Sequence, residues 1–276
     1  MKNFIIVLCL LTLSAIFNFS VCLAKDIDAF KGDKGIIRIS GGTAHIPVIK
    51  EAARRIMKSN PDIQIIIAGG GSGVGIKQVG EGLVDIGNSG RKPSQIEIKK
   101  YNLKLYKWAI DGVCAIVNSK NKIKNLSSLQ LQNIFSGKIT NWKELGGENR
   151  DINVYTRDAA SGTRSVFWKK ALKKGKITNK ANVVVSNGAM KTAVKNDPQG
   201  IGYVSVGFVD KQIAPIALNG VTPSIKSIKN KTYKIARYLY SNTKGHPTGL
   251  VDKFIKYLLS PEGQKIAKAK GFIPIN

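Results

Sequence analysis

Residues 69–75 read GGGSGVG and residues 157–164 read RDAASGTR, and each stretch stands between an apolar run and a helical pattern. The first follows the apolar run at 63–67, and the second follows a shorter apolar run at 152–155. Each pattern predicts a strand, a tight turn and the start of a helix. Because the start of a helix carries unpaired backbone N–H groups and about half a positive charge, both turns are candidate anion sites.

The rest of the chain alternates strand-like and helix-like patterns, which indicates an α/β fold. Three successive strands are predicted over about 36–39, 63–67 and 83–86, and each ends in a loop of small and hydroxyl-bearing residues. In open α/β sheets, ligands bind beyond the carboxyl ends of the strands. We therefore expect these loops to meet at one site.

Two further strand-like stretches lie at residues 105–118, which read LYKWAIDGVCAIVN, and at residues 238–240, which read YLY. No low-complexity linker accompanies them, so we expect two crossover strands between two lobes, with an inter-lobe ligand cleft. The predicted first lobe combines residues 25–112 and 237–276. The predicted second lobe is residues 113–236.

The first 24 residues have the pattern of a secretory signal peptide. Lys2 gives a positive start, the apolar run at 4–13 is short for a membrane span, and cleavage is expected after Ala24. An uncleaved anchor and a lipoprotein processed before Cys22 are the alternatives, although the residues before Cys22 make a poor lipidation box. The expected location is the periplasm.

The composition is strongly basic: 44 Lys and Arg residues stand against 17 Asp and Glu residues, for a formal net charge of +27. Such a surface favours anionic partners through long-range steering. The lysines are spread along the chain, and no nucleic-acid motif or aromatic interleaving accompanies them, so no nucleic-acid partner is expected. After removal of the signal peptide the one remaining cysteine is Cys114, which is predicted to be a small core residue.

The glycine loop is not a nucleotide-binding fingerprint, because Ile76 stands where a P-loop requires lysine. Glycines allow a backbone to approach a ligand closely, and Ser72 adds a hydrogen-bond donor. A purely structural turn and an anion site are equally open for this loop.

The RDAASGTR loop is more specific. Ser161, Gly162 and Thr163 would present successive N–H groups at a helix start. Arg157 could bind an oxyanion through two parallel hydrogen bonds. The alternative is that Ser161 is only a helix cap and Arg157 a surface residue.

Catalytic and metal chemistry find little support in the sequence. The chain has two histidines, His45 and His246, and lacks a G-x-S-x-G elbow, an H-E-x-x-H motif and a cysteine–histidine cluster. His45 lies beside a loop threonine, but polar filling is the better interpretation than a catalytic pair. Asp85 is expected to bond to turn backbone rather than to act as a general base. We therefore expect no catalytic residues and no metal site.

Several stretches together resemble the substrate-binding component of bacterial phosphate ABC transporters, within the type II periplasmic binding proteins. They are Gly42-Thr43 with Pro47, GGGSGVG, VDIG, DGVCAIVN, NLSSLQLQNIFSGKITNWKELGG, RDAASGTR, GIGY and LSPEGQKIAKAKGFIPI. The similarity extends over about residues 36–275. It implies the two-lobed type II fold, with phosphate held between the lobes by hydrogen bonds and without a metal or cofactor. A membrane permease is the implied partner, and a monomer is expected.

The resemblance also implies which residues hold the phosphate: Thr43, Ala44, Ser72, Ser89, Gly90, Arg157, Ser161, Gly162 and Thr163. The loop after VDIG departs from the family pattern. Some members place an aspartate there that accepts the proton of hydrogen phosphate, and many others have Ser-Arg. This chain reads Ser89-Gly90-Arg91, which puts Gly90 at the acceptor position, and the Ser89 hydroxyl could substitute. Without a buried carboxylate, weaker rejection of sulfate is expected.

The predicted function is high-affinity extracytoplasmic binding of inorganic phosphate, closure of the lobes about a hinge, and delivery to an ABC transporter permease. A binding protein for another oxyanion, such as sulfate, molybdate or arsenate, is the alternative within this class. A secreted phosphohydrolase or an adhesion protein on the same scaffold is the alternative from another class. Selectivity, affinity and the cognate permease are left open by the sequence.

Overall fold

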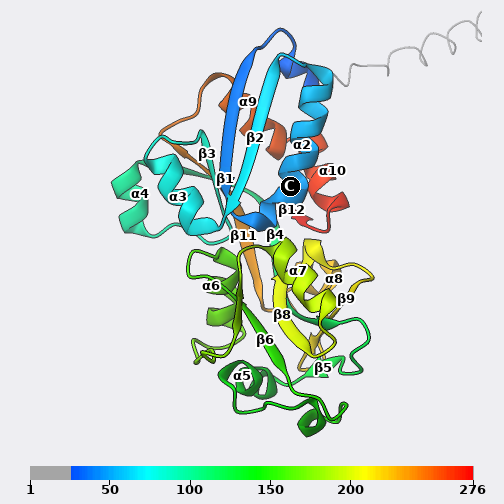
Figure 1. Cartoon of the computed structure of the whole chain (residues 1–276). Coiled ribbons are helices and arrows are strands. Elements are labelled where there is room, and N and C mark those ends of the chain that lie inside the picture. The colour runs from blue at the N-terminus through cyan, green and yellow to red at the C-terminus, as the bar shows by residue number, and fades with distance from the viewer. Residues whose placement is uncertain (1–25, 276) are drawn as a thin grey trace, which may run out of the picture.

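Two lobes joined by a pair of long strands make up the protein, in a computed structural model that describes residues 26–275 (Figure 1). The joining strands are β4 (Leu103–Asn118) and β11 (Ala236–Lys244), which pair antiparallel to each other. The two predicted crossover strands are therefore present. The predicted signal peptide, its cleavage site and Cys22 lie outside the described residues.

The first lobe is built on three parallel strands, in the order β2-β1-β3, and β11 adds to β3 in the antiparallel sense. The strands are β1 (Gly35–Gly41), β2 (Ile63–Gly70), β3 (Ile86–Ser89) and the short β12 (Ile273–Pro274). The helices are α2 (Ile46–Ser59), α3 (Ser72–Gly80), α4 (Gln95–Tyr101), α9 (Gly249–Leu259) and α10 (Pro261–Ala269), with short 3₁₀ turns at Asp26–Phe30 and Thr43–His45.

The second lobe continues the sheet from β4, which pairs antiparallel with β8, while β6 and β7 lie parallel to one another. Its strands are β6 (Asn153–Arg157), β7 (Asn182–Val184), β8 (Gly200–Ser205) and β9 (Ile213–Pro215), with a small separate pair, β5 (Asn125–Leu126) and β10 (Ala217–Leu218). Its helices are α5 (Ser128–Ser136), α6 (Gly162–Lys170), α7 (Asn187–Asn196) and α8 (Ile225–Lys229), with 3₁₀ turns at Trp142–Leu145 and Val206–Phe208.

Helix α2 shows why the predicted elements form. Its buried side chains, Val48, Ile49, Ala52, Ala53 and Ile56, recur at the spacing of one helical face, so they pack on the first-lobe sheet. The helix ends at Asn60, whose amide Nδ2 donates to the carbonyl oxygens of Phe30 and Asp33 at 2.7 Å each. The helical spacing of these apolar side chains therefore accounts for the burial of the helix, and the contacts of Asn60 fix its end.

The two largest hydrophobic clusters each belong to one lobe, and the boundary between them runs across the joining strands. Along β4, Trp108 and Ala109 pack with the first lobe, whereas Val113 and the residues after it pack with the second. Along β11, Leu239 belongs to the core of the first lobe. The predicted boundary 112/113 lies between Ala109 and Val113, where β4 passes from one core to the other, and the predicted boundary 236/237 lies shortly before Leu239. The two boundaries stay a prediction.

The second-lobe core confirms one expectation about chemistry. Cys114 is fully buried there, so it is a core residue, and its burial raises the pKa of the thiol. The rings of Phe167 and Tyr203 stack 4.2 Å apart nearby, which ties α6 to β8. None of the helices within residues 26–275 combines the length and the hydropathy needed to span a bilayer.

The strand predicted at about 83–86 is placed differently in the structure. Strand β3 begins at Ile86, not at Leu83, which is 60% exposed in the turn before it. Asp85 in that turn accepts a hydrogen bond from the backbone N–H of Arg38 at 2.6 Å, so it bonds to backbone as expected, but to strand β1 rather than to the turn. Strand β7 is at the end of the sheet, so Val185 beyond it reaches solvent.

Candidate functional site

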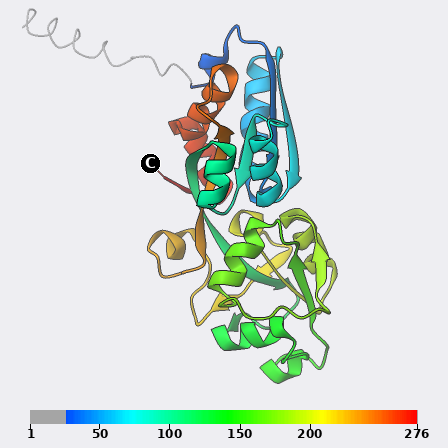
Figure 2. The same cartoon turned by 90° about the vertical axis from the view of Figure 1, so that its left-hand side faces the viewer.

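Strand ends from both lobes meet where the lobes touch (Figures 1 and 2). In the first lobe the parallel strands β1, β2 and β3 end at this edge, and in the second lobe β6 and β7 end opposite them. Four helical segments begin directly after these strands: the turn Thr43–His45 that leads into α2, and helices α3, α6 and α7. The N-terminal ends of these four segments, with their partial positive charge, therefore converge on one place.

A small cavity lies at this meeting point. It is lined by Gly42, Thr43, Ala44, Gly71, Ser72, Gly90, Arg157, Ser161, Gly162, Thr163 and Arg237. Eight of the nine predicted site residues are among them, and Ser89 is not. The GGGSGVG loop and the RDAASGTR loop thus face each other across the cleft.

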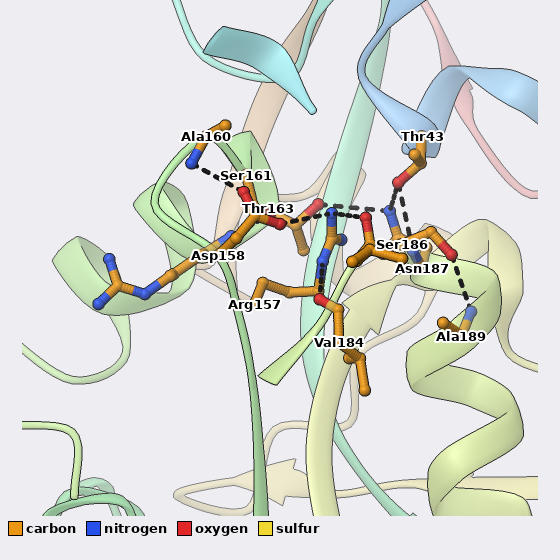
Figure 3. Close-up of polar contacts among 12 residues, drawn as sticks. Thr43, Arg157, Asp158, Ala160, Ser161, Thr163, Val184, Ser186, Asn187 and Ala189 are labelled. Atoms are coloured by element: carbon orange, nitrogen blue, oxygen red, sulfur yellow. Dashed lines mark hydrogen bonds and ion pairs between the residues drawn. The ribbon is translucent and has the colours of Figure 1, made fainter. Parts of the chain in front are cut away.

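Arg157 is the last residue of β6. It is only 2% exposed, and hydrogen bonds to backbone hold its side chain in place. Its Nε donates to the carbonyl oxygen of Val184 and its Nη2 to that of Val185, each at 3.0 Å (Figure 3). Asp158 lies 3.9 Å from Nη2. The remaining nitrogen, Nη1, is buried and has no partner among the described residues. Burial lowers the pKa of Arg157, yet a guanidinium keeps its charge at neutral pH.

Ser161 combines the two roles that the sequence left as alternatives. Its hydroxyl accepts a hydrogen bond from the backbone N–H of Arg164 at 3.1 Å, so it caps α6, and it also lines the cavity. Gly162 and Thr163 follow as the first residues of α6. Figure 3 shows Ser161 and Thr163 beside the guanidinium of Arg157.

The glycine loop lies against the second lobe. Gly70 and Gly71 have φ angles of 113° and 89°, a region that disfavours other residues, and a Cβ on Gly71 would meet the carbonyl oxygen of Ala160 at 2.9 Å. The N–H of Gly73, two residues further on, donates to the same oxygen at 2.9 Å. Ser72 therefore reaches the cavity from a loop that is packed across the cleft.

Arg237 was missed by the sequence reasoning, although it lines the cavity. Its Nε donates to Asp111 Oδ2 at 2.9 Å, and its Nη2 donates to the Thr163 hydroxyl at 3.0 Å. Its Nη1 donates to the carbonyl oxygen of Gly90 at 3.2 Å. A signal was present, because Asp111 lies in the first predicted crossover strand and Arg237, of opposite charge, directly precedes the second.

Asn187, the first residue of α7, was also missed. Its backbone N–H and its Nδ2 both donate to the Thr43 hydroxyl, at 3.2 and 3.0 Å, so it links the two lobes (Figure 3). Its Oδ1 accepts from the N–H of Ser205 at 3.0 Å. The sequence signal was the run of valines followed by Ser186, Asn187 and a glycine, which is another strand leading to a helix start.

Known proteins carry the same architecture. The PBP superfamily domain matches residues 28–262. The phosphate-binding protein PstS of Bacillus subtilis (strain 168) is 37% identical over 254 residues, which cover 90% of this chain and 84% of that protein. The chain belongs to the PBP superfamily and, within it, to the PstS family.

Solved structures agree with this membership. A protein of Clostridium perfringens with bound phosphate is 33% identical, with a TM-score of 0.82, and the match covers 88% of this chain and 100% of that one. An ABC-type phosphate transport receptor of Vibrio cholerae is 31% identical, with a TM-score of 0.69, over 86% of this chain and 99% of that one. The predicted two-lobed type II periplasmic-binding fold is confirmed.

Ser89 has a different environment from the other predicted ligands in this member of the PstS family. Its hydroxyl accepts a hydrogen bond from Asn242 Nδ2 at 2.9 Å, on the neighbouring strand β11. Because the residue is buried and lies outside the cavity lining, its predicted contact with an anion has no geometric support. The prediction itself stays untested.

His45 has the structural role that was expected. Its Nδ1 lies 3.0 Å from the carbonyl oxygen of Gly42, which can only accept, so this nitrogen carries the proton. Its ring also packs edge-on against Trp108 at 5.5 Å between centroids. Within residues 26–275, no group of three or more His, Cys, Asp and Glu side chains is placed to hold a metal ion.

The burial of His45 predicts a loss of stability in acid. Burial first, and then the charge of Arg237, lower the pKa of His45 from 6.5 to about 3. Between these values the unfolded chain binds a proton that the folded chain does not, so stability falls as pH falls below about 6.5. We expect His45 to account for about 2 kcal/mol between pH 6.5 and pH 5.

Denaturant unfolding at both pH values checks this expectation. His45→Asn keeps a donor for Gly42 but cannot titrate, so its stability should fall by less over the same interval. An equal fall in the variant and the wild type would contradict the assignment.

Proposed function

We propose that this chain binds inorganic phosphate between its lobes and delivers it to the permease of an ABC transporter. The observation that carries the proposal is Arg157 Nη1, a buried cationic donor without a partner among the described residues, on the wall of the inter-lobe cavity. An unpaired buried donor of this kind costs folding free energy unless a ligand accepts its hydrogen bond. Relatives named as phosphate-binding proteins, and a related structure with bound phosphate, support the choice of anion.

The lining is suited to a small multivalent anion. It combines two guanidinium groups, those of Arg157 and Arg237, with four hydroxyls and the N–H groups of helix starts. Asp and Glu are absent from the described residues that line it. Each hydrogen bond to a charged group contributes roughly 1.5–3 kcal/mol, so several together support micromolar binding, about 8 kcal/mol, after ordering costs.

Closure of the lobes couples capture to delivery in this proposal. Phosphate would contact Ser72 and Thr43 in the first lobe and Arg157 in the second, so it favours the closed arrangement, in which both sets of contacts exist. Strands β4 and β11 are the connections about which the lobes would move. Export to the periplasm, a monomeric state and docking of the closed form on the permease complete the proposal.

A binding protein fits this lining better than a hydrolase. Its ionisable side chains are the two arginines, which do not act as general bases at neutral pH, and His45 is engaged with Gly42. We therefore propose no enzymatic activity. A chromogenic phosphate ester should show no turnover above the buffer rate.

Calorimetric titration of the phosphate-stripped mature protein tests the proposal. Phosphate should bind one to one, with a Kd of about 1 μM or lower. Binding of a different oxyanion without any affinity for phosphate would show that the other oxyanion is the ligand. If none of the oxyanions tested binds, the proposal is wrong.

A further inference from the structure

Two of the cavity hydroxyls have no acceptor capacity left. Thr43 Oγ1 accepts from the backbone N–H and the Nδ2 of Asn187, at 3.2 and 3.0 Å. Thr163 Oγ1 accepts from Arg237 Nη2 at 3.0 Å and from Asn187 Nδ2 at 3.4 Å. A hydroxyl has two lone pairs and one proton, so each threonine can offer a ligand only its proton.

The two serine hydroxyls are partly committed in the same sense. Ser72 Oγ accepts from the N–H of Gly90 at 2.9 Å, and Ser161 Oγ accepts from the N–H of Arg164 at 3.1 Å. Each retains one lone pair besides its proton. All four hydroxyls can therefore donate into the cavity, and only the two serines keep a lone pair that can accept a proton from a ligand.

The nearby carboxylates do not add hydrogen-bond acceptors to the cavity. Asp111 is fully buried, and its oxygens accept from Ser205 Oγ at 2.7 Å and from Arg237 at 2.8 Å, so they are turned away from the lining. Burial raises the pKa of Asp111 and the charge of Arg237 opposes that shift. Asp158 lies against Arg157 but does not line the cavity.

We infer that the site takes its ligand as a tetrahedral dianion, recognised by charge and by donated hydrogen bonds rather than by a proton on the ligand, and that Arg237 sets this preference. The inference rests on the proposed function and narrows it to an ionisation state. Monohydrogen phosphate then binds better than dihydrogen phosphate, which carries one charge fewer and one more proton to place. Sulfate, a dianion without a proton, competes.

The position of Arg237 depends on Gly90. A Cβ at residue 90 would lie 2.6 Å from Arg237 Nη1 and 2.8 Å from its Cζ. Any side chain there, a carboxylate included, would displace the guanidinium. The absence of a side chain at residue 90 therefore allows a second cation to lie beside the cavity.

Calorimetry with phosphate and with sulfate, at several pH values below and above the second ionisation of phosphate, tests the inference. Phosphate affinity should fall about tenfold for each pH unit below that ionisation, as the dianion fraction falls. Sulfate stays a dianion, so its affinity should not change, which separates ligand titration from protein titration. Sulfate should bind within about a hundredfold of phosphate, because no carboxylate in the lining repels it.

The possible outcomes separate this inference from the function on which it rests. Tight phosphate binding that is independent of pH, or that excludes sulfate, would overturn the dianion preference and leave phosphate binding intact. Binding of neither anion would overturn the proposed function itself.

A paired substitution tests the role of Arg237. Arg237→Gln together with Asp111→Asn removes both charges and keeps hydrogen-bonding side chains, so the net charge is unchanged and no buried charge is left unpaired. We expect affinity for both anions to fall at least tenfold and the pH dependence for phosphate to become shallower. Unchanged affinity and pH dependence in a folded double variant would show that Arg237 is only structural. Arg91→Gln is the matched control, because Arg91 pairs with Glu97 outside the cavity.

Discussion

Replacing Arg157 with alanine is expected to weaken phosphate binding about a hundredfold. The guanidinium is fixed by the carbonyl oxygens of Val184 and Val185, and its Nη1 is left for the ligand. A buried, charge-assisted contact that is already oriented loses little entropy on binding, so its removal costs about 3 kcal/mol. Calorimetric titration of the variant with phosphate measures the loss.

Arg157→Lys separates charge from geometry. A lysine keeps the positive charge but cannot bridge two carbonyl oxygens and a ligand at once, so we expect an intermediate loss of affinity. Thermal unfolding of both variants without phosphate shows whether the second lobe is intact. Wild-type affinity in the alanine variant would remove Arg157 from the site.

Replacing Gly162 with alanine is expected to lower phosphate affinity at least tenfold without destabilising the free protein. A Cβ there would lie 2.1 Å from Ser72 Oγ and 3.2 Å from the carbonyl carbon of Gly90, both in the opposite lobe. The clash therefore exists only when the lobes are closed. Alanine also has a higher helix propensity than glycine at the start of α6, so the substitution should not destabilise the second lobe itself.

Gly188→Ala is the control for this substitution. Gly188 stands at the start of α7, also beside the cleft, but a Cβ there would meet its nearest neighbour, Ser186 Oγ, at 3.7 Å. Its phosphate affinity should match that of the wild type. Equal affinities in the two alanine variants would show that closure does not bring Gly162 against Ser72. Titration with phosphate and thermal unfolding check both variants.

The fold and most of the site follow from local sequence features. Glycine-rich and hydroxyl-rich turns after apolar runs predict strand ends and helix starts, and these features need no knowledge of distant contacts. Ser161 is an example, because capping of α6 and lining of the cavity both follow from its place before the helix. The burial of Cys114 follows in the same way from its apolar neighbours.

The residues that sequence reasoning missed or misplaced depend on contacts between distant segments. Arg237 reaches the cavity because β11 pairs with β4, which brings it to Asp111, and because residue 90 has no side chain. Asn187 faces Thr43 only because the lobes meet. Leu83 is apolar and is still exposed, since strand β3 begins three residues later. No local pattern contains these pairings.

A crystal structure of the phosphate complex tests the central claim most directly. The claim is that one anion is held between the lobes by groups from both of them. We predict phosphate oxygens within about 3.2 Å of Arg157 Nη1, and of the hydroxyls of Ser72 and Thr43 on the opposite lobe. Phosphate bound elsewhere, or bound to one lobe while Arg157 Nη1 contacts only protein, would contradict the account.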